Sequence, residues 1–160
     1  LGDLRFDFES GDLQGWRMIE GAFGQPVSSA SSLPRWQKAP FGRQGKFHLS
    51  TIALKDDSGV SDAQVGVIES PRFRLTGARI AFLIGGGFRD DVHLSICDEG
   101  GKEIARSGGT NGPRMVRRVV HLPKHKDKIL FLRIIDRATK GWGHILLDDF
   151  SAQGEHLGKN

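Results

Sequence analysis

The sequence has little cysteine, no long apolar run and no helical periodicity. Cys97 is the only cysteine, so the chain closes no internal disulfide and depends on its apolar core, with or without a metal. No apolar run approaches the ~20 residues that cross a bilayer, so we expect no membrane insertion. Apolar residues do not recur at helical spacing over any stretch of about twelve residues. The sequence opens at Leu1 without a signal-peptide pattern, which is typical of a processed product or an excised module.

Signatures of catalysis are also missing. The sequence contains neither Gly-x-Ser-x-Gly nor His-Glu-x-x-His. Cys97 lies in a strand-like run with no activating signature, so we expect a buried, inert thiol. The remaining candidates are scattered: Glu69, Asp90, Asp91, Asp136, His93, His121, His125 and His144. Nothing in the sequence pairs the carboxylates for acid–base catalysis, and the histidines do not have the spacing of zinc ligands. We therefore expect that this chain alone is not an enzyme.

Glycine is abundant, with 22 residues in 160, and it accompanies many short runs of strand character. Helices tolerate glycine poorly, whereas turns between strands favour it. About ten runs alternate or are apolar between Gly, Pro or Asp turns: Arg5 to Phe8, Trp16 to Ile19, Lys46 to Thr51, Val65 to Phe73, Arg79 to Ile84, Val92 to Cys97, Lys102 to Ala105, Met115 to Leu122, Ile129 to Ile135 and His144 to Phe150. The pattern predicts an all-β, antiparallel β-sandwich.

The length fits one domain with one core. We place the domain at residues 1–153 and expect residues 154–160 to be a tail or linker stub. The least strand-like region runs from Gly21 to Gly45 and carries Trp36 and Arg43. A loop of that length in a compact domain indicates function or mobility.

Positive charge is concentrated in one stretch. The net charge is +4, and Arg114, Arg117, Arg118, Lys124, Lys126 and Lys128 are opposed there only by Asp127. Such a run can attract nucleic acid or an anionic polysaccharide, or can simply be a solvated strand face and a turn. We favour the solvated face and expect no nucleic-acid partner.

Gly85, Gly86 and Gly87 follow an apolar strand but do not form a phosphate loop. No Lys-Ser/Thr pair follows them, and no helix begins there. We expect these glycines to permit positive φ and close backbone approach where the strand ends.

Two segments together resemble a known family. The first is Asp7-Phe8-Glu9-Ser10-Gly11 with Gly15-Trp16, and the second is Asp136-Arg137-Ala138-Thr139-Lys140-Gly141-Trp142-Gly143-His144, closing in Asp148-Asp149-Phe150. In this order they resemble the jelly-roll carbohydrate-binding modules of bacterial levanases, family 66, and related modules on secreted bacterial proteins. The resemblance runs from Asp7 to Phe150 and implies a jelly-roll fold and a glycan ligand.

The resemblance also implies a structural calcium ion. In jelly-roll modules a Phe-Glu pair near the start and an Asp-Asp pair near the end lie close, and calcium favours such oxygen ligands. We expect Glu9 and Asp149 as ligands, with Asp148 and Asp7 in reserve. Alternatively, these acids pair with Arg or Lys or cap turns.

The expected glycan site centres on Trp142 and His144. Flanking glycines leave the indole uncovered for stacking on a sugar, while a few polar groups bond hydroxyls. We expect those groups to be Asp136, Arg137, Lys140 and His144, with a rim of Trp36, Arg43, Lys46 and Arg89. Alternatively, Trp142 plugs the end of the sandwich. Trp16 is expected in the core.

We therefore expect a non-catalytic carbohydrate-binding module that tethers a secreted or cell-surface enzyme to polysaccharide. Its partners would be a polysaccharide or oligosaccharide and a covalently linked catalytic domain, and the module itself would be a monomer. The alternative is a structural or protein-interaction β-sandwich of a multidomain surface protein with no glycan site.

Overall fold

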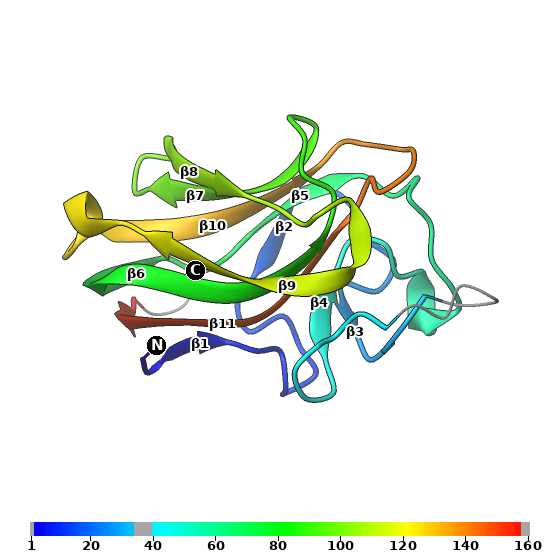
Figure 1. Ribbon diagram of the computed structural model, residues 1–160, viewed down its shortest axis with the longest axis horizontal. Coiled ribbons are helices and arrows are strands. Elements are labelled where there is room, and N and C mark those ends of the chain that lie inside the picture. Colours follow the sequence, from blue (N-terminus) through cyan, green and yellow to red (C-terminus); the bar gives the residue numbers. More distant parts are fainter. Residues whose placement is uncertain (1, 34–39, 158–160) are drawn as a thin grey trace.

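The computed structural model describes residues 2–33 and 40–157 (Figure 1). Its strands are β1 (Leu4–Phe6), β2 (Arg17–Gly21), β3 (Val27–Ser28), β4 (His48–Ser50), β5 (Gly66–Glu69), β6 (Phe73–Gly86), β7 (Val92–Asp98), β8 (Glu103–Ser107), β9 (Gly112–His121), β10 (Ile129–Asp136) and β11 (Ile145–His156). Two short 3-10 helices, η2 (Lys55–Asp57) and η3 (Pro123–His125), lie in connections. Within the described ranges no helix is long and apolar enough to span a membrane.

The described strands form one antiparallel sheet that curls into two layers. One layer has the order β2-β5-β10-β7-β8, and the other has β9-β6-β11 with β1 and the β4-β3 pair beside β11. A short β10–β6 pairing, Ile129 with Arg74 and Leu130 with Phe73, connects the layers at one edge. All-β sandwich architecture is confirmed.

The core lies between the two layers. Alternating residues of each layer point inward, as a sheet with one solvated face requires. Leu132 and Ile134 of β10 share one apolar cluster with Phe82 of β6 and Phe150 of β11. Trp16 is buried in this cluster and meets Phe6 edge-on with ring centroids 5.7 Å apart, which confirms its expected place. Cys97 is fully buried too, and burial raises the pKa of its thiol, as expected of an inert cysteine.

Two sequence-based boundaries were wrong. The predicted runs Val65 to Phe73 and Arg79 to Ile84 left residues 74–78 outside a strand, but β6 continues through them from Phe73 to Gly86. Gly77 is needed for close approach, because a Cβ there would lie 2.7 Å from the Gln153 side chain. The other error concerns residues 154–156, which we assigned to the tail: they continue β11 and pair with residues 73–75 of β6.

Candidate functional site

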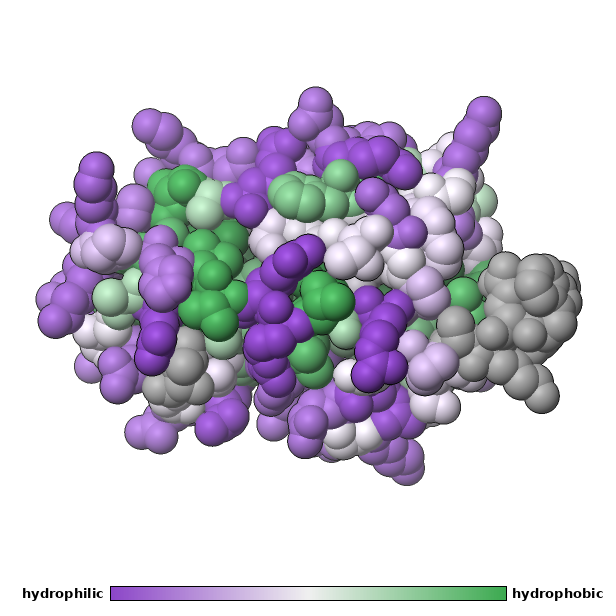
Figure 2. Space-filling model, in the orientation of Figure 1, coloured by the Kyte–Doolittle hydropathy of each residue, from purple (hydrophilic) through white to green (hydrophobic). Residues whose placement is uncertain are grey.

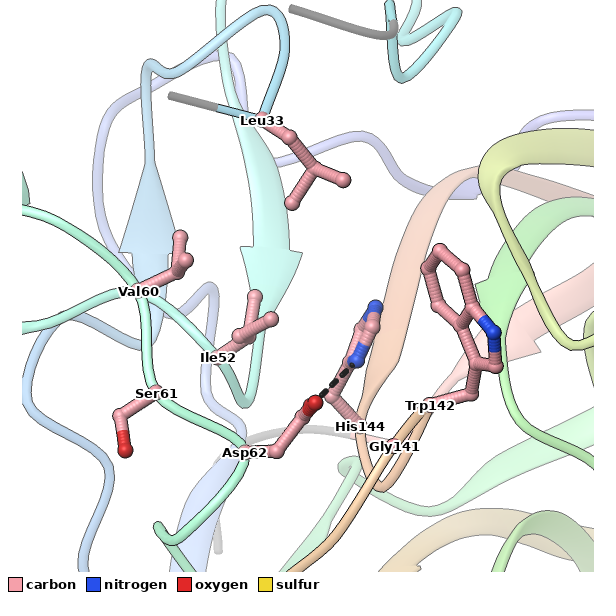
Figure 3. Close-up of a pocket in the computed structure, with 8 residues that line it drawn as sticks. All are labelled: Leu33, Ile52, Val60, Ser61, Asp62, Gly141, Trp142 and His144. Atoms are coloured by element: carbon pink, nitrogen blue, oxygen red, sulfur yellow. Dashed lines mark hydrogen bonds and ion pairs between the residues drawn. The ribbon is translucent and has the colours of Figure 1, made fainter. Parts of the chain in front are cut away.

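A cavity of about 300 Å³ opens where two long connections meet (Figure 3). The β4–β5 connection contributes Ile52, Val60, Ser61 and Asp62, and the β10–β11 connection contributes Gly141, Trp142 and His144. Leu33, from the β3–β4 connection, completes the lining. In Figure 3 the Trp142 indole stands on one side of this space and the aliphatic side chains on the other. We call this space the first cavity.

The polar centre of the first cavity is a carboxylate–imidazole pair. Asp62 Oδ1 lies 2.7 Å from Nδ1 of His144, whose ring is almost completely buried. A hydrogen bond of this length to a carboxylate places an imidazole proton on Nδ1. Nε2 has no hydrogen-bond partner among the described residues and points away from Asp62 toward the space between Leu33 and Trp142 (Figure 3). This nitrogen is therefore buried without a partner in that part of the chain.

Trp142 reaches the cavity because its backbone adopts an unusual conformation. It has φ of 57° in a tight turn that the Gly143 N–H closes on the Lys140 carbonyl at 2.7 Å. The turn lies against the end of β6, where a Cβ on Gly86 or Gly87 would come within 2.1 Å or 2.3 Å of the turn's carbonyl oxygens. This confirms the close-approach role that we expected for the glycine run. The half-buried indole packs on the small apolar cluster of Leu33 and Met115, so Trp142 is both packed and reachable.

A smaller cavity of about 60 Å³ adjoins the first and shares Ile52 and Val60 with it. We call it the second cavity. Its remaining lining is Ser28, Ala30, Ser32, Phe41, Ser50, Ala53, Asp57 and Gly59. The Ser28 hydroxyl donates to Asp57 Oδ1 at 2.6 Å, which fixes that carboxylate at the rim.

Asp136 lies in the interior and does not face a ligand, contrary to our expectation. It is the last residue of β10 and is fully buried. Burial raises its pKa to about 7. The Thr51 hydroxyl and the Ala138 N–H lower that pKa in part, but neither reaches good hydrogen-bond geometry with the carboxylate. The sequence did carry a signal for this burial, because period-two alternation places Asp136 on the same face as Leu132 and Ile134.

The other expected sugar-binding residues are spread out. Arg89 donates to the Gly141 carbonyl at 3.1 Å and so braces the turn beside the first cavity, while Lys140 is exposed in that turn. Arg137 points elsewhere and pairs with Glu20 at 3.0 Å. Arg43 donates to the backbone oxygens of Ser29 and Ala30, close to the second cavity. Trp36 lies outside the described residues.

Two of the four expected metal ligands accept hydrogen bonds from backbone amides of the same loop, residues 44–47. Glu9 accepts hydrogen bonds from the amides of Lys46 and Phe47 at 2.7 and 2.9 Å, and Asp148 accepts one from Gln44 at 2.7 Å. Asp148 is fully buried on β11, where burial raises its pKa to about 7 and the neighbouring Asp149 and Glu9 carboxylates add to the rise. Among the described residues, none forms a salt bridge with Asp148. The Asp148 carboxylate therefore has no positively charged partner in that part of the chain.

The other two expected ligands have partners of their own. Asp149 forms a 2.8 Å ion pair with Arg117. Asp7 accepts hydrogen bonds from the Glu9 amide and the Gln14 side chain, both at 3.1 Å. In the part of the chain that the structure describes, no three His, Cys, Asp or Glu side chains converge as a metal cluster. An ion at Glu9 and Asp148 would therefore need carbonyl or water oxygens as further ligands, which calcium accepts.

The basic stretch is divided between a strand and a turn, in agreement with the solvated-face interpretation. Arg117 is tied to Asp149, and Arg118 donates to the Gly108 and Gly109 carbonyls at 3.3 and 3.4 Å. Lys124 lies in η3, and Lys126 and Lys128 follow in the turn before β10. Figure 2 shows polar and apolar side chains interleaved over the face that carries β9, not one continuous charged surface.

Sequence reasoning missed the β4–β5 side of the first cavity. Ile52, Val60 and Asp62 belong to a connection that has no motif, and Asp62 meets His144 across 82 residues of sequence. No signal in a single sequence identifies such a pair.

The curled antiparallel sandwich is a fold that this chain shares with solved carbohydrate-binding and adhesin domains. The carbohydrate-binding module TmCBM61, solved in complex with β-1,4-galactotriose, superposes with a TM-score of 0.55 at 20% identity, over 90% of this chain and 91% of its own. The K1 cleaved adhesin domain of Lys-gingipain from Porphyromonas gingivalis W83 gives 0.56 at 16% identity, over 97% and 98%. The K2 adhesin domain gives 0.53 at 19% identity, over 92% and 96%. These likenesses show the fold.

Sequence comparison adds one relative. Over 112 residues, 70% of this chain, the sequence is 33% identical to the protein named "Putative glycosyl hydrolase ecdE" of Aspergillus rugulosus. The matched region spans only 15% of that protein's length. No protein-family model matches the chain.

Proposed function

We propose that this chain is a non-catalytic carbohydrate-binding module whose glycan site is the first cavity. The observation that carries the proposal is that the half-buried Trp142 indole and the partly exposed Asp62 carboxylate line one cavity. A sugar offers an apolar C–H face and hydroxyls, and this pairing of an aromatic surface with a placed polar group suits both. The fold shared with TmCBM61, which was solved with a galacto-oligosaccharide, supports the proposal.

Each lining group has a distinct task in this proposal. Trp142 stacks on a sugar ring, and Ile52 and Val60 form the apolar wall opposite it. The buried His144 ring packs beside the indole, with ring centroids 5.8 Å apart, and the partly exposed Asp62 carboxylate accepts hydrogen bonds from hydroxyls. Asp62 is a positioning residue, because it fixes the imidazole tautomer as carboxylates do behind many functional histidines. Arg89 holds the turn through Gly141.

The module's place in a larger protein is part of the proposal. A relative named as a glycosyl hydrolase, of which this chain matches only a fraction, supports a module covalently linked to a catalytic domain outside the cytoplasm. Such a module raises the local concentration of substrate for its neighbour. The alternative is a protein-interaction sandwich, a use that the adhesin-like fold also permits.

Calcium is proposed as a structural ligand at Glu9 and Asp148. Asp148 is a fully buried carboxylate without a counterion among the described residues, and the Glu9 carboxylate, which accepts from the same 44–47 loop, helps to raise its pKa. Such a pair fits a bound divalent cation. Gly45 supports the arrangement, because it has φ of +67° and its missing Cβ leaves room for the Glu9 carboxylate. The ion would hold the β3–β4 connection against β11, close to the second cavity.

The test is a glycan array probed with the isolated domain, followed by titration of Trp142→Ala. We expect loss of glycan binding that exceeds any loss of thermal stability. Phe88→Ala is the matched control, because Phe88 is an exposed aromatic outside both cavities. An array without any bound glycan, from a domain shown to be folded, would overturn the proposal in favour of a protein-interaction role.

A further inference from the structure

The turn between β6 and β7, residues 89–92, supports the β10–β11 connection. Two backbone hydrogen bonds between its first and last residues, at 2.8 and 3.1 Å, close this turn. It contacts the β10–β11 connection at two points. The Arg137 amide donates to the Asp91 carbonyl at 2.7 Å, and the Arg89 guanidinium donates to the Gly141 carbonyl at 3.1 Å. The aromatic side of the first cavity therefore depends on the position of the 89–92 turn.

His93 holds this turn from β7. Leu94 and Ile96 of β7 belong to the core cluster, so alternation along the strand places His93 on the outer face of its layer. Its side chain is nevertheless only 3% exposed. Nδ1 of the ring lies 3.0 Å from the Arg89 carbonyl oxygen. Because a carbonyl oxygen only accepts, the imidazole donates there, and the ring is attached to the backbone of the turn.

The other side of the His93 ring is attached to the β7–β8 hairpin. Nε2 lies 3.1 Å from the Ser95 hydroxyl, which donates to Glu103 Oε1 at 2.5 Å. Glu103 in turn forms an ion pair with Arg106 of β8 at 3.0 Å. Both ring nitrogens therefore have partners, one in the 89–92 turn and the other in the hairpin. An imidazole held at both nitrogens has little freedom to rotate.

The hydrogen bond from His93 is the stronger of two side-chain attachments of the turn. The other is an ion pair between Arg106 and Asp90, at 2.8 Å. The Asp90 side chain is fully exposed, and water and salt screen such a pair. The His93 ring is shielded from water, and a hydrogen bond in such surroundings is stronger. His93 therefore contributes more than Arg106 to holding the turn on β7 and β8.

Building on the proposed function, we propose that His93 is a positioning residue for the glycan site. Through the Arg89 backbone it fixes the 89–92 turn, and through that turn it fixes the connection that carries the Trp142 indole. His93 does not itself touch the ligand, because its buried ring is not part of the lining of the first cavity. An indole that is already in place when the sugar arrives loses less entropy on binding.

Two substitutions separate the two hydrogen bonds of the ring. The amide nitrogen of asparagine takes about the place of Nδ1, and that of glutamine takes about the place of Nε2. His93→Asn thus keeps a donor for the Arg89 carbonyl, whereas His93→Gln keeps only the contact with the Ser95 hydroxyl. If attachment of the turn is the role of His93, the first variant preserves the site and the second disturbs it.

The first experiment is fluorine NMR of the domain labelled with fluorotryptophan, without any ligand. The Trp142 resonance is the one that Trp142→Phe removes, and the resonance of buried Trp16 is assigned in the same way. We expect His93→Gln to shift or broaden the Trp142 resonance and His93→Asn to leave it in place, with the Trp16 resonance unchanged in both. A Trp142 resonance that is insensitive to His93→Gln, or that changes equally in both variants, would overturn the positioning role.

Arg89→Met and Glu69→Gln complete the series. Arg89→Met removes the donor to the Gly141 carbonyl from an exposed side chain, so it should change the Trp142 resonance as His93→Gln does. An unchanged resonance would overturn the proposal even if the His93 variants do not fold. Glu69→Gln is the matched control, because it disturbs a 2.7 Å ion pair with Arg133 on the same outer face. It should leave the Trp142 resonance in place.

The second experiment is calorimetric titration of the same variants with the best glycan from the array. We expect affinity to fall about fivefold in His93→Gln and to stay unchanged in His93→Asn and Glu69→Gln. A displaced Trp142 resonance with unchanged affinity would overturn the role of His93 in binding. Since the NMR experiment needs no ligand, its failure overturns the positioning role alone, whereas an array without any bound glycan overturns the proposed function.

Discussion

Asp62 and His144 are joined by a 2.7 Å contact across 82 residues of sequence. The contact links the β4–β5 connection to the turn that precedes β11, so the two walls of the first cavity are fixed to each other at its polar centre. Both loops must be placed correctly before the site exists. The imidazole is thereby oriented before any ligand arrives, which reduces the entropy lost on binding.

Two substitutions of Asp62 distinguish the loss of its carboxylate charge from the loss of its hydrogen bond to His144. Asp62→Ala removes the acceptor for Nδ1 and frees the ring, so we expect glycan affinity to fall about tenfold. Asp62→Asn keeps an acceptor of the same size and should retain most of the affinity. Titration calorimetry with the best array glycan measures both, and equal losses for the two variants would contradict the positioning role.

The burial of Asp136 predicts a dependence of stability on pH. Its pKa rises to about 7 in the folded chain, mainly through desolvation, from 3.8. The folded state therefore binds more protons than the unfolded state between about pH 4 and 7, and this group's contribution to stability falls as pH rises through that window. Asp136→Asn should then stabilise the domain at pH 8, by about 4 kcal/mol at most, and should lose that advantage near pH 4. Chemical denaturation at the two pH values tests this, and a pH-independent difference would contradict it.

His48 predicts the opposite slope over nearly the same pH window. It is fully buried on β4, and neither ring nitrogen has a hydrogen-bond partner among the described residues. Burial, followed by the nearby Arg43 charge, lowers its pKa from 6.5 to about 4. The unfolded chain takes up the proton first, so stability from this group is present above pH 6.5 and is lost as pH falls toward 4, by about 3 kcal/mol.

His48→Phe tests this effect, because it keeps the edge contact with Phe41 and removes the titrating group. The expected result is a smaller loss of melting temperature between pH 7 and pH 4.5 than in the unaltered chain. An identical loss in both would show that His48 does not contribute.

Removal of calcium should lower the melting temperature. If Glu9 and Asp148 hold the ion, a chelator destabilises the loaded domain and added calcium restores it in proportion to concentration, by mass action. Asp148→Asn should abolish the response, whereas Asp149→Asn, which breaks only the Arg117 ion pair, should preserve it. A calcium-loaded sample that ignores the chelator would exclude the site.

The strands were predictable because alternation and glycine turns are local signals. Most of the predicted runs agree with observed strands to within a few residues, and β3, with only Val27 and Ser28, gave no pattern to read. One side of the candidate site was predictable, because Trp142 and His144 lie in a glycine-flanked turn that is visible in the sequence. Asp62 was not predictable, because its role depends on tertiary placement alone. Asp136 was misassigned because we expected a carboxylate to be exposed, although alternation along β10 places it on the inward face with Leu132 and Ile134.

Strand β11 also separates the ends of the chain from the ligand cavities. It runs for 12 residues, about 40 Å, from the Trp142–His144 turn to His156, and β1 pairs beside it with Leu4 opposite Ala152. The beginning of β1 and the end of β11 therefore lie at the end of the sandwich remote from the Trp142–His144 turn (Figure 1). A neighbouring domain joined beyond these strands would start from the end remote from the cavities. The domain can thus be placed at the start, middle or end of a larger chain, in tandem or as an insertion, without its neighbours closing off the cavities.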